Sequence, residues 1–399
     1  MRSLLLIVPF LWVLISCSET TSNNTPESEV EETIAVPEVI ELTGSGYDRG
    51  LQHGKILKKE IANIITDWKE NVRTNSGKDP EMVLDSFFLY ASFDNAIKKW
   101  TPDLYEEIKG IAEGSGQSLR DVMVLNLLDE FWVYIDDLFN HHCSGVGVPS
   151  LAGEPAYIAQ NMDLEQYTDG YQVIFRIAGT DSVPEQLILS HAGLIALNGM
   201  NRAGIGVCVN TLMQLKASNE GVPVAFIVRR IISSTDRNEL LRFIQSVPHA
   251  SGQNYILGIR NQVFDFEASA HKVVRFDPGN PNGSVYHTNH PIVNEDIKPW
   301  HKNLLDSTMN NNQGNSVIRF ASLEKRMPLV NSGAVDTIQV TLRSKDSENF
   351  PVCQPMDGRG GTFASVIMTL GKNPGFKWTV GSPDKMEYVD VPFTDQNKK

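Results

Sequence analysis

The spacing of apolar residues predicts a helical first part of the folded chain. From Gly54 to Val72, apolar residues recur every three or four positions, which is typical of one face of an amphipathic helix. Thr101 and Pro102 are suited to a helix start, and Gly114 and Gly116 to its end. The pattern predicts helices over residues 54–72, 80–100, 101–116 and 118–139.

At Cys143 the pattern changes to short runs with a high β-strand preference, separated by Gly, Pro and Asp turn signals. The predicted strands cover residues 143–148, 156–162, 172–177, 186–190, 205–210, 254–260, 262–268, 365–370, 377–380 and 386–391. A long helical stretch from Pro223 to Val247 lies between them. Strands, then helices, then strands favour a layered α+β domain over a doubly wound parallel sheet.

The first residues have the pattern of an export signal. Arg2 precedes an apolar run from Leu4 to Ile15, which is too short for a bilayer core of about 30 Å. The sequence around Ser16 and Cys17 resembles the bacterial lipobox, whose cysteine becomes lipidated. An ordinary secretory signal with an incidental Cys17 is the alternative. We expect an exported bacterial lipoprotein, anchored to the membrane by its N-terminal lipid and facing the periplasm or the cell surface.

These patterns predict four parts of the chain. They are a signal peptide over 1–16, an acidic flexible tether over 17–43, a helical segment over 44–142 and the core domain over 143–393. The tether is rich in Ser, Thr, Asn, Pro and Glu, a composition that does not support a packed core.

Composition and charge narrow the function classes. The chain has 399 residues, of which 41% are hydrophobic, and a formal net charge of −13. These proportions are those of a globular protein, and the acidic balance argues against nucleic acid as a partner. Four cysteines are too few for a disulfide scaffold. Cys208 and Cys353 form either a disulfide or two buried free thiols.

Cys143 is the first candidate for chemistry, because it stands where the helical part gives way to the strands. If the chain is cut before it, Cys143 gains an α-amine with a reference pKa of about 7.7–8 beside a thiol of about 8.5. Such an amine is a general base near the working pH. The alternative for a lone cysteine is an inert buried side chain.

Several polar residues are candidate partners of Cys143. Asp163, which with Asn161 lies on or just after the second strand, is placed to hold the new ammonium group. Asn210 and Asn289, at strand ends, are candidate donors to an oxyanion, and turn hydrogen bonds are their alternative.

Other kinds of site lack their signatures. The adjacent residues His141, His142 and Cys143 rarely converge on one metal ion. No G-x-S-x-G motif or Gly-rich phosphate loop is present. We expect no metal and no cofactor.

Motifs in a fixed order give the chain a family resemblance. They are Gly50-Leu51-Gln52-His53-Gly54, Gly110-Ile111-Ala112-Glu113-Gly114, Leu125-Asn126 with Glu130, Cys143-Ser144, Gln160-Asn161-Met162-Asp163, Asn201-Arg202-Ala203-Gly204 with Asn210, and Thr288-Asn289-His290. The chain resembles the acyl-coenzyme A:6-aminopenicillanic acid acyltransferase (isopenicillin N acyltransferase) family of Ntn hydrolases. This autoproteolytic family is related to the choloylglycine hydrolases.

The resemblance implies a four-layer αββα sandwich preceded by a helical segment, and self-cleavage between His142 and Cys143. Cys143 becomes nucleophile and base, and Asp163 orients its amine. Asn289 is the leading oxyanion donor and Asn210 the second, with Asn161 as a further catalytic candidate. Arg319 and Gln160 are candidate substrate-binding residues, Arg319 for a substrate carboxylate.

Three residues depart from the family pattern. Leu128 stands where the family has Arg, and His142 precedes the nucleophile in place of a small or acidic residue. Gln160 stands where relatives that hydrolyse conjugated bile salts and penicillin V have Arg. Substrate preference is therefore not transferred from these relatives.

We expect an exported, self-cleaving amidohydrolase that acts on small linear N-acyl amides through a thioester. Coenzyme A is cytosolic, which favours water as the acyl acceptor. Two alternatives stay open: an acyltransferase that uses another amine, with or without coenzyme A, and a ligand-binding surface lipoprotein without activity.

Overall fold

The computed structural model describes residues 39–135, 143–299, 301, 314–330 and 334–394. Within these ranges the strands form two sheets. The eight-stranded sheet has the order β1 (Val39–Leu42), β4 (Gln172–Ile177), β5 (Gln186–His191), β6 (Asn198–Asn201), β7 (Ile205–Thr211), β8 (Gln253–Ile259), β9 (Gln262–Ala268) and β10 (Val273–Phe276). The six-stranded sheet has the order β11 (Val285–His287), β2 (Ser144–Val148), β3 (Tyr157–Glu165), β12 (Gly360–Thr369), β13 (Gly375–Val380) and β14 (Val389–Val391).

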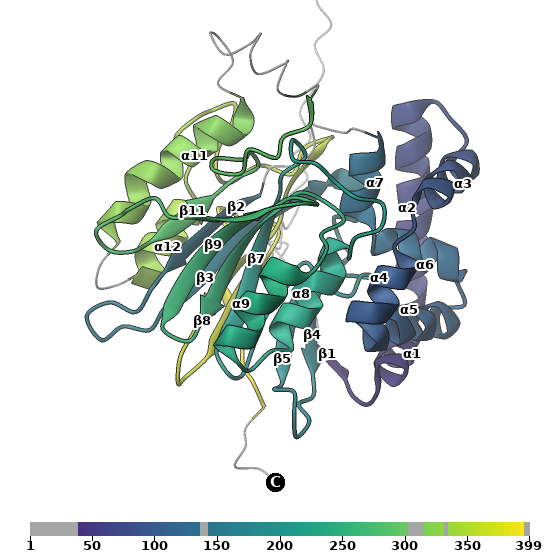
Figure 1. Cartoon of the computed structure of the whole chain (residues 1–399), viewed down its shortest axis with the longest axis horizontal. Coiled ribbons are helices and arrows are strands. Elements are labelled where there is room, and N and C mark those ends of the chain that lie inside the picture. The colour runs from purple at the N-terminus through teal and green to yellow at the C-terminus, as the bar shows by residue number, and fades with distance from the viewer. Residues whose placement is uncertain (1–38, 136–142, 300, 302–313, 331–333, 395–399) are drawn as a thin grey trace, which may run out of the picture. The chain divides into compact units, whose positions relative to one another are not determined.

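The two sheets face each other between layers of helices (Figure 1). β2 and β3 of the smaller sheet contact β7 and β8 of the larger one. Helix α8 (Val224–Ile232), followed by α9 (Arg237–Ser246), packs on β6 and β7. Helices α11 (Asn315–Arg326) and α12 (Ala334–Leu342) pack on the six-stranded sheet. This arrangement confirms the predicted α+β, four-layer αββα sandwich.

A helical segment precedes the sandwich, as predicted. It comprises α1 (Gly46–Ile56), α2 (Lys58–Ser76), α3 (Pro80–Tyr90), α4 (Asp94–Trp100), α5 (Pro102–Ser115), α6 (Leu119–Leu125) and α7 (Leu128–Ile135). Short 3₁₀ turns lie at Gln166–Thr168 and Met327–Leu329. Trp68 and Phe131 are buried in this segment, and their rings meet edge to face at 5.2 Å.

The glycine motifs of α1 and α5 allow these helices to touch backbone to backbone. A Cβ atom added to Gly50 would lie 1.9 Å from the carbonyl oxygen of Glu107, and one added to Gly110 would lie 2.3 Å from that of Tyr47. His53, in the same motif, accepts a 3.0 Å hydrogen bond from the backbone N–H of Gly193. The glycines therefore allow α1 and α5 to pack closely, and His53 connects α1 to the turn after β5 of the larger sheet.

Several predicted boundaries are wrong. The helices expected over 80–100 and 223–247 are each two helices, α3 with α4 and α8 with α9. The expected tether is too long, because Val39–Leu42 form β1, which pairs in parallel with β4. The sequence pattern did not identify β6, β10, β11, α11 or α12. The predicted signal peptide, Cys17 and the rest of the tether lie outside the described residues.

The described helices include none that is long and apolar enough to cross a membrane. Cys143, Cys208 and Cys353 are buried free thiols. Of the two alternatives for Cys208 and Cys353, the structure therefore contains the free thiols and not the disulfide.

Candidate active site

Cys143 lies immediately before β2, and the pairing of β2 with β3 determines its neighbours. Ser144 lies opposite Asn161, so Cys143 meets β3 at Met162 and Asp163. The backbone N–H of Asp163 donates to Sγ of Cys143 at 3.4 Å. Burial, together with the charge of Asp163, raises the pKa of the Cys143 thiol to about 12. The thiol of the uncleaved chain is therefore a poor source of thiolate at neutral pH.

The carboxylate of Asp163 is buried beside this thiol and lacks a partner. The residue is 3% exposed, and neither carboxylate oxygen has a hydrogen-bond partner among the described residues. Burial raises the pKa of Asp163 to about 7, although Arg319 and Thr362 oppose the rise. An isolated buried carboxylate is unfavourable, and a cation next to Cys143 would relieve it.

Arg319, on α11, holds the backbone of the nucleophile. Its Nη1 donates to the carbonyl oxygen of Cys143 at 2.7 Å and to Oγ of Ser144 at 2.8 Å. Its Nη2 donates to Oδ1 of Asn289 at 3.0 Å, and its Nε donates to Asn315. The side chain is fully buried. The structure thus corrects the expectation that Arg319 meets a substrate carboxylate.

Asn289 follows β11 and is held by its neighbours. Its Oδ1 accepts from Arg319, and its Nδ2 donates to the carbonyl oxygen of Thr211 at 3.1 Å. Because an amide nitrogen carries two hydrogens, a second N–H remains for another acceptor. The buried pair between His287 Nε2 and Glu267 Oε1, at 2.9 Å, fixes the strand that leads to Asn289.

Asn210, on β7, has a buried amide without a partner. Neither Nδ2 nor Oδ1 has a hydrogen-bond partner among the described residues, and the residue is fully buried. A Cβ atom added to Gly145 would lie 3.0 Å from Oδ1, so Asn210 lies against β2 close to Cys143. Buried polar groups are almost always paired, so this amide is a candidate donor to a bound substrate.

The structure does not bring two predicted site residues into the site. Asn161 donates from Nδ2 to the carbonyl oxygens of Leu342, at 2.8 Å, and Val352, at 3.0 Å. These bonds attach β3 to the region of α12, which corrects the catalytic expectation for Asn161. Gln160 is fully buried and bonds to Val209 and Asn198 between the two sheets, so its amide is not available to a substrate.

Cys143 opens on a cavity of about 40 Å³, much smaller than an ordinary ligand pocket. The polar side chains in its wall are Asp129, Cys143, Asp163 and Thr211. The rest is apolar: Trp132, Met162, Leu164, Ala196, Leu197, Val209, Val224, Ala225 and Val228. Sequence reasoning missed Asp129. Two adjacent carboxylates, Asp129 and Glu130, in a very apolar helical stretch were the available signal.

A larger groove adjoins this cavity. It measures about 950 Å³ and lies among α2, α3 and α7. Its apolar lining includes Trp68, Val72, Val83 and Phe131, and Trp132 lines both the groove and the cavity. Trp132 therefore stands between the nucleophile and an apolar space large enough for an acyl chain.

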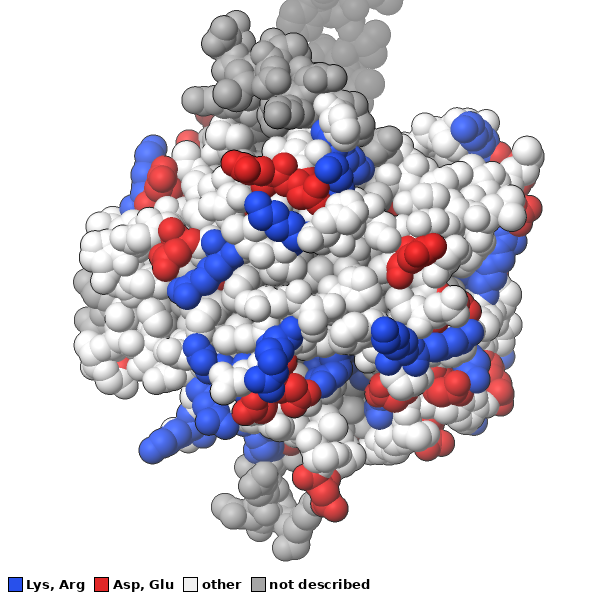
Figure 2. All heavy atoms as spheres, in the orientation of Figure 1, with Lys and Arg blue, Asp and Glu red and all other residues white. Residues whose placement is uncertain are grey.

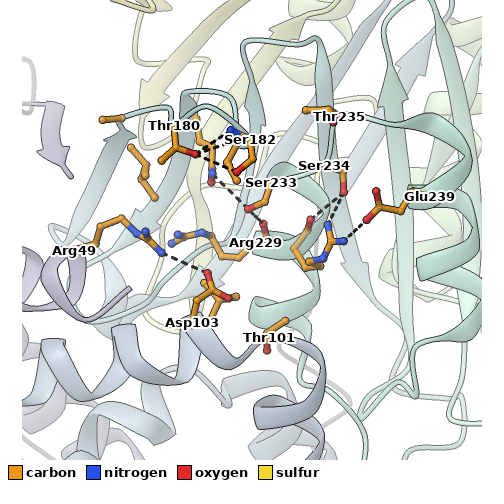
Figure 3. Close-up of a pocket in the computed structure, with 16 residues that line it drawn as sticks. Arg49, Thr101, Asp103, Thr180, Ser182, Arg229, Ser233, Ser234, Thr235 and Glu239 are labelled. Carbon is orange, nitrogen blue, oxygen red and sulfur yellow. Dashed lines mark hydrogen bonds and ion pairs between the residues drawn. The ribbon is translucent and has the colours of Figure 1, made fainter. Parts of the chain in front are cut away.

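A third cavity, of about 350 Å³, is polar and separate (Figure 3). Arg49, Arg229 and Arg230 line it together with several hydroxyl groups, and it shares no described lining residue with the Cys143 cavity. Arg49 and Arg229 both pair with Glu107, each at 2.8 Å, behind the cavity. The face in Figure 2 shows acidic and basic side chains interspersed.

His142, the expected residue before the cleavage point, lies outside the described residues, as does His141. Among the residues that are described, no three His, Cys, Asp or Glu side chains are arranged to hold a metal ion.

Residues 153–385 match the sequence profile of the acyl-coenzyme A:6-aminopenicillanic acid acyl-transferase family. The chain belongs to this family. The match begins after Cys143 and contains Asp163, Asn210, Asn289 and Arg319.

Two curated relatives align with about two thirds of the chain. The chain is 26% identical to the acyl-coenzyme A:6-aminopenicillanic-acid-acyltransferase 40 kDa form of Emericella nidulans, over 63% of this chain and 68% of the relative. It is 28% identical to protein dcd1A of Dictyostelium discoideum, over 64% of each chain.

Solved structures are similar at low identity. A Caenorhabditis elegans ortholog of N-acylethanolamine-hydrolyzing acid amidase has 13% identity and a TM-score of 0.39, over 57% of this chain and 92% of that one. Penicillin V acylase from Agrobacterium tumefaciens has 13% identity and a TM-score of 0.40, over 64% and 86%.

Proposed function

We propose that the chain is a self-cleaving amidohydrolase that uses N-terminal Cys143 on linear N-acyl amides. The observation that carries the proposal is the buried carboxylate of Asp163, which accepts no hydrogen bond of ordinary geometry from the described residues of the uncleaved chain. Cleavage before Cys143 creates an ammonium group beside this carboxylate. The family membership supports the same chemistry.

Self-cleavage begins when Sγ of Cys143 attacks the carbonyl carbon of residue 142. The C–N bond breaks, the acyl group moves to sulfur as a thioester, and the nitrogen becomes the α-amine of Cys143. Water then hydrolyses the thioester, which frees the thiol and leaves a carboxylate on His142. Arg319 keeps the Cys143 backbone in place through its 2.7 Å bond to the Cys143 carbonyl oxygen.

In the cleaved enzyme the α-amine accepts the thiol proton, and the thiolate attacks the acyl carbon of the substrate. Asn289 and Asn210 donate to the oxyanion that forms. The ammonium then gives its proton to the leaving amine, and an acyl thioester remains. Water, deprotonated by the same amine, releases the carboxylic acid and restores the thiol.

The apolar lining supports an apolar acyl group. Trp132 and Met162 border the thiol, and the groove of about 950 Å³ begins on the other side of Trp132. In this proposal the acyl chain enters that groove. The cavity of about 40 Å³ has to open when substrate binds.

The proposal includes export and lipidation at Cys17, supported by the apolar run and the lipobox-like sequence before Cys17. An exported enzyme does not meet cytosolic coenzyme A, which favours water as the acyl acceptor. The family name favours acyl transfer as the second candidate function.

The test is release of free amine from N-acyl amides of increasing chain length, without coenzyme A. We expect amine and fatty acid in equal amounts from the wild type and none from Cys143→Ala. Added hydroxylamine should trap the thioester as a hydroxamate. Product that forms only when coenzyme A or a second amine is added would support the acyltransferase instead. Equal activity of Cys143→Ala would exclude both candidate mechanisms.

A further inference from the structure

The wall of the Cys143 cavity contains a carboxylate that the proposed chemistry leaves unused. Asp129, on α7, lines the cavity together with Cys143 and Asp163. Thr211 donates to Oδ2 of Asp129 at 2.7 Å, and Gln253 donates to the same oxygen at 2.5 Å. No described residue hydrogen-bonds to Oδ1, so this oxygen is available to a ligand.

The charge balance of the cavity changes when the chain is cleaved. Among the described lining residues there is no Lys, Arg or His. The new ammonium group of Cys143 offsets Asp163, and Asp129 is then the carboxylate without a counter-charge. Burial raises the pKa of Asp129, while the bonds from Thr211 and Gln253 oppose the rise. A carboxylate in apolar surroundings favours a cation or a hydrogen-bond donor as its neighbour.

Two polar side chains near Cys143, Arg319 and Gln160, already have protein partners. Each of the three nitrogen atoms of Arg319 has a protein partner. The amide of Gln160 is bonded through both its nitrogen and its oxygen. A substrate carboxylate close to the scissile amide would therefore face Asp129 with no Lys, Arg or His among the described lining residues to offset its charge.

We infer that Asp129 determines specificity: it binds a cationic or hydrogen-bond-donating group of the substrate beside the scissile amide, and it excludes substrates with a carboxylate there. This inference rests on the proposed function, and it specifies the substrate class. The favoured substrate has an apolar chain on one side of the amide and a short amino- or hydroxyl-bearing group on the other.

Two matched substrate series test the inference with the full chain. The first contains the octanoyl amides of 1,3-diaminopropane, butylamine and β-alanine, which end in ammonium, methyl and carboxylate groups. The second places these end groups on the acyl side, as the β-alanyl, butanoyl and succinyl amides of octylamine. The readout is kcat/KM for each compound with the wild type, Asp129→Asn and the matched control Glu130→Gln. Glu130 is the adjacent buried carboxylate, but it does not line the cavity.

In at least one series we expect the wild type to prefer the ammonium compound over the methyl compound by about tenfold or more, as for a charge-assisted hydrogen bond. The carboxylate compound should be the slowest. Asp129→Asn should remove most of this preference, and Glu130→Gln should keep it. The same rate for all three end groups in both series, or an unchanged preference in Asp129→Asn, would overturn the inference and leave the proposed function intact.

Three further outcomes bear on the inference. If the wild type hydrolyses none of the six compounds, the proposed function fails, and the inference fails with it. If Asp129→Asn does not fold, Asp129→Ser replaces it with another uncharged side chain, and Asp129→Glu should retain the ammonium preference. A wild type that is fastest on a carboxylate compound overturns the inference without any variant.

Discussion

The guanidinium group of Arg319 donates a 2.7 Å hydrogen bond to the backbone carbonyl of Cys143. Another of its nitrogens donates to Oδ1 of Asn289 at 3.0 Å, so one buried side chain connects the proposed nucleophile to the proposed oxyanion donor. Lys has a single charged nitrogen and lacks the planar fork that makes these bonds together.

Arg319→Lys should therefore slow self-cleavage by about 10- to 100-fold, the range for loss of a charged hydrogen bond. The rate is measured by the appearance of two chains on denaturing gels. The control is Arg326→Lys, on the same helix, where a half-buried Arg pairs with Asp346. Cleavage of Arg319→Lys at the wild-type rate would contradict the positioning role.

Asp163 should make the uncleaved chain less stable at high pH. The pKa of Asp163 in the folded chain is about 7, above its ordinary value of 3.8. The folded state therefore holds the proton more tightly, and the free energy of unfolding falls as the pH rises from about 4 to about 7. A difference of one between the pKa values in the folded and unfolded states changes the free energy of unfolding by about 1.4 kcal/mol.

The measurement uses urea unfolding of the uncleaved Cys143→Ala chain at pH 5 and pH 8. Adding Asp163→Asn should raise the stability at pH 8 and reduce the difference between the two pH values. Other buried acids, such as Asp265, keep part of that difference, because burial raises the pKa of Asp265 to about 7 as well. Asp103→Asn, at a carboxylate that is 66% exposed, is the control. A loss of stability at pH 8 in Asp163→Asn would contradict the account.

Replacing Asn289 should impair catalysis, whereas replacing Asn161 should impair stability. Asn289→Ala removes a proposed oxyanion donor and should lower kcat by about 100- to 1000-fold. Asn161→Ala removes the hydrogen bonds to the carbonyl oxygens of Leu342 and Val352. It should lower the melting temperature while kcat changes little. Steady-state kinetics and thermal melting of both variants separate the roles. An Asn161→Ala variant with normal stability but little activity would restore Asn161 as a catalytic candidate.

The glycine contact between α1 and α5 should tolerate no side chain. Gly50→Ala places Cβ within 1.9 Å of a backbone oxygen, which only a movement of the helices relieves. We expect a loss of about 1–3 kcal/mol or more, the range for overpacked cores. Gly358→Ala is the matched control, because a Cβ atom there meets nothing within 4 Å. Equal melting temperatures for the two variants would contradict the packing role.

The pattern predicted a layered α+β domain because buried strands and amphipathic helices leave a periodic signal, whereas the order of the four layers was implied by the family resemblance. The run 172–177 matches β4 residue for residue. β11 has only three residues, too few for a period to show. The break between α3 and α4 falls in a stretch that keeps its helical spacing through Ala91 and Phe93. Such boundaries depend on tertiary contacts more than on local pattern.

The closeness of Asp163 to Cys143 was predictable, because the two neighbouring strands that carry them pair as a hairpin. Contacts between distant segments were not predictable. Arg319 reaches Cys143 from a helix that the pattern did not identify, and its role changes from substrate binding to positioning. Asp129 belongs to the cavity because α7 lies against β7 and β8, where Thr211 and Gln253 donate to its carboxylate.

Self-cleavage is the central claim, and intact mass with N-terminal sequencing tests it most directly. The chain is produced from Ser18 onward, beside its Cys143→Ala variant. The account predicts that the wild type splits into two chains, that the second chain begins Cys-Ser-Gly-Val, and that Cys143→Ala stays whole. A wild type that remains a single chain under native conditions would leave Cys143 without its amine and would contradict the account.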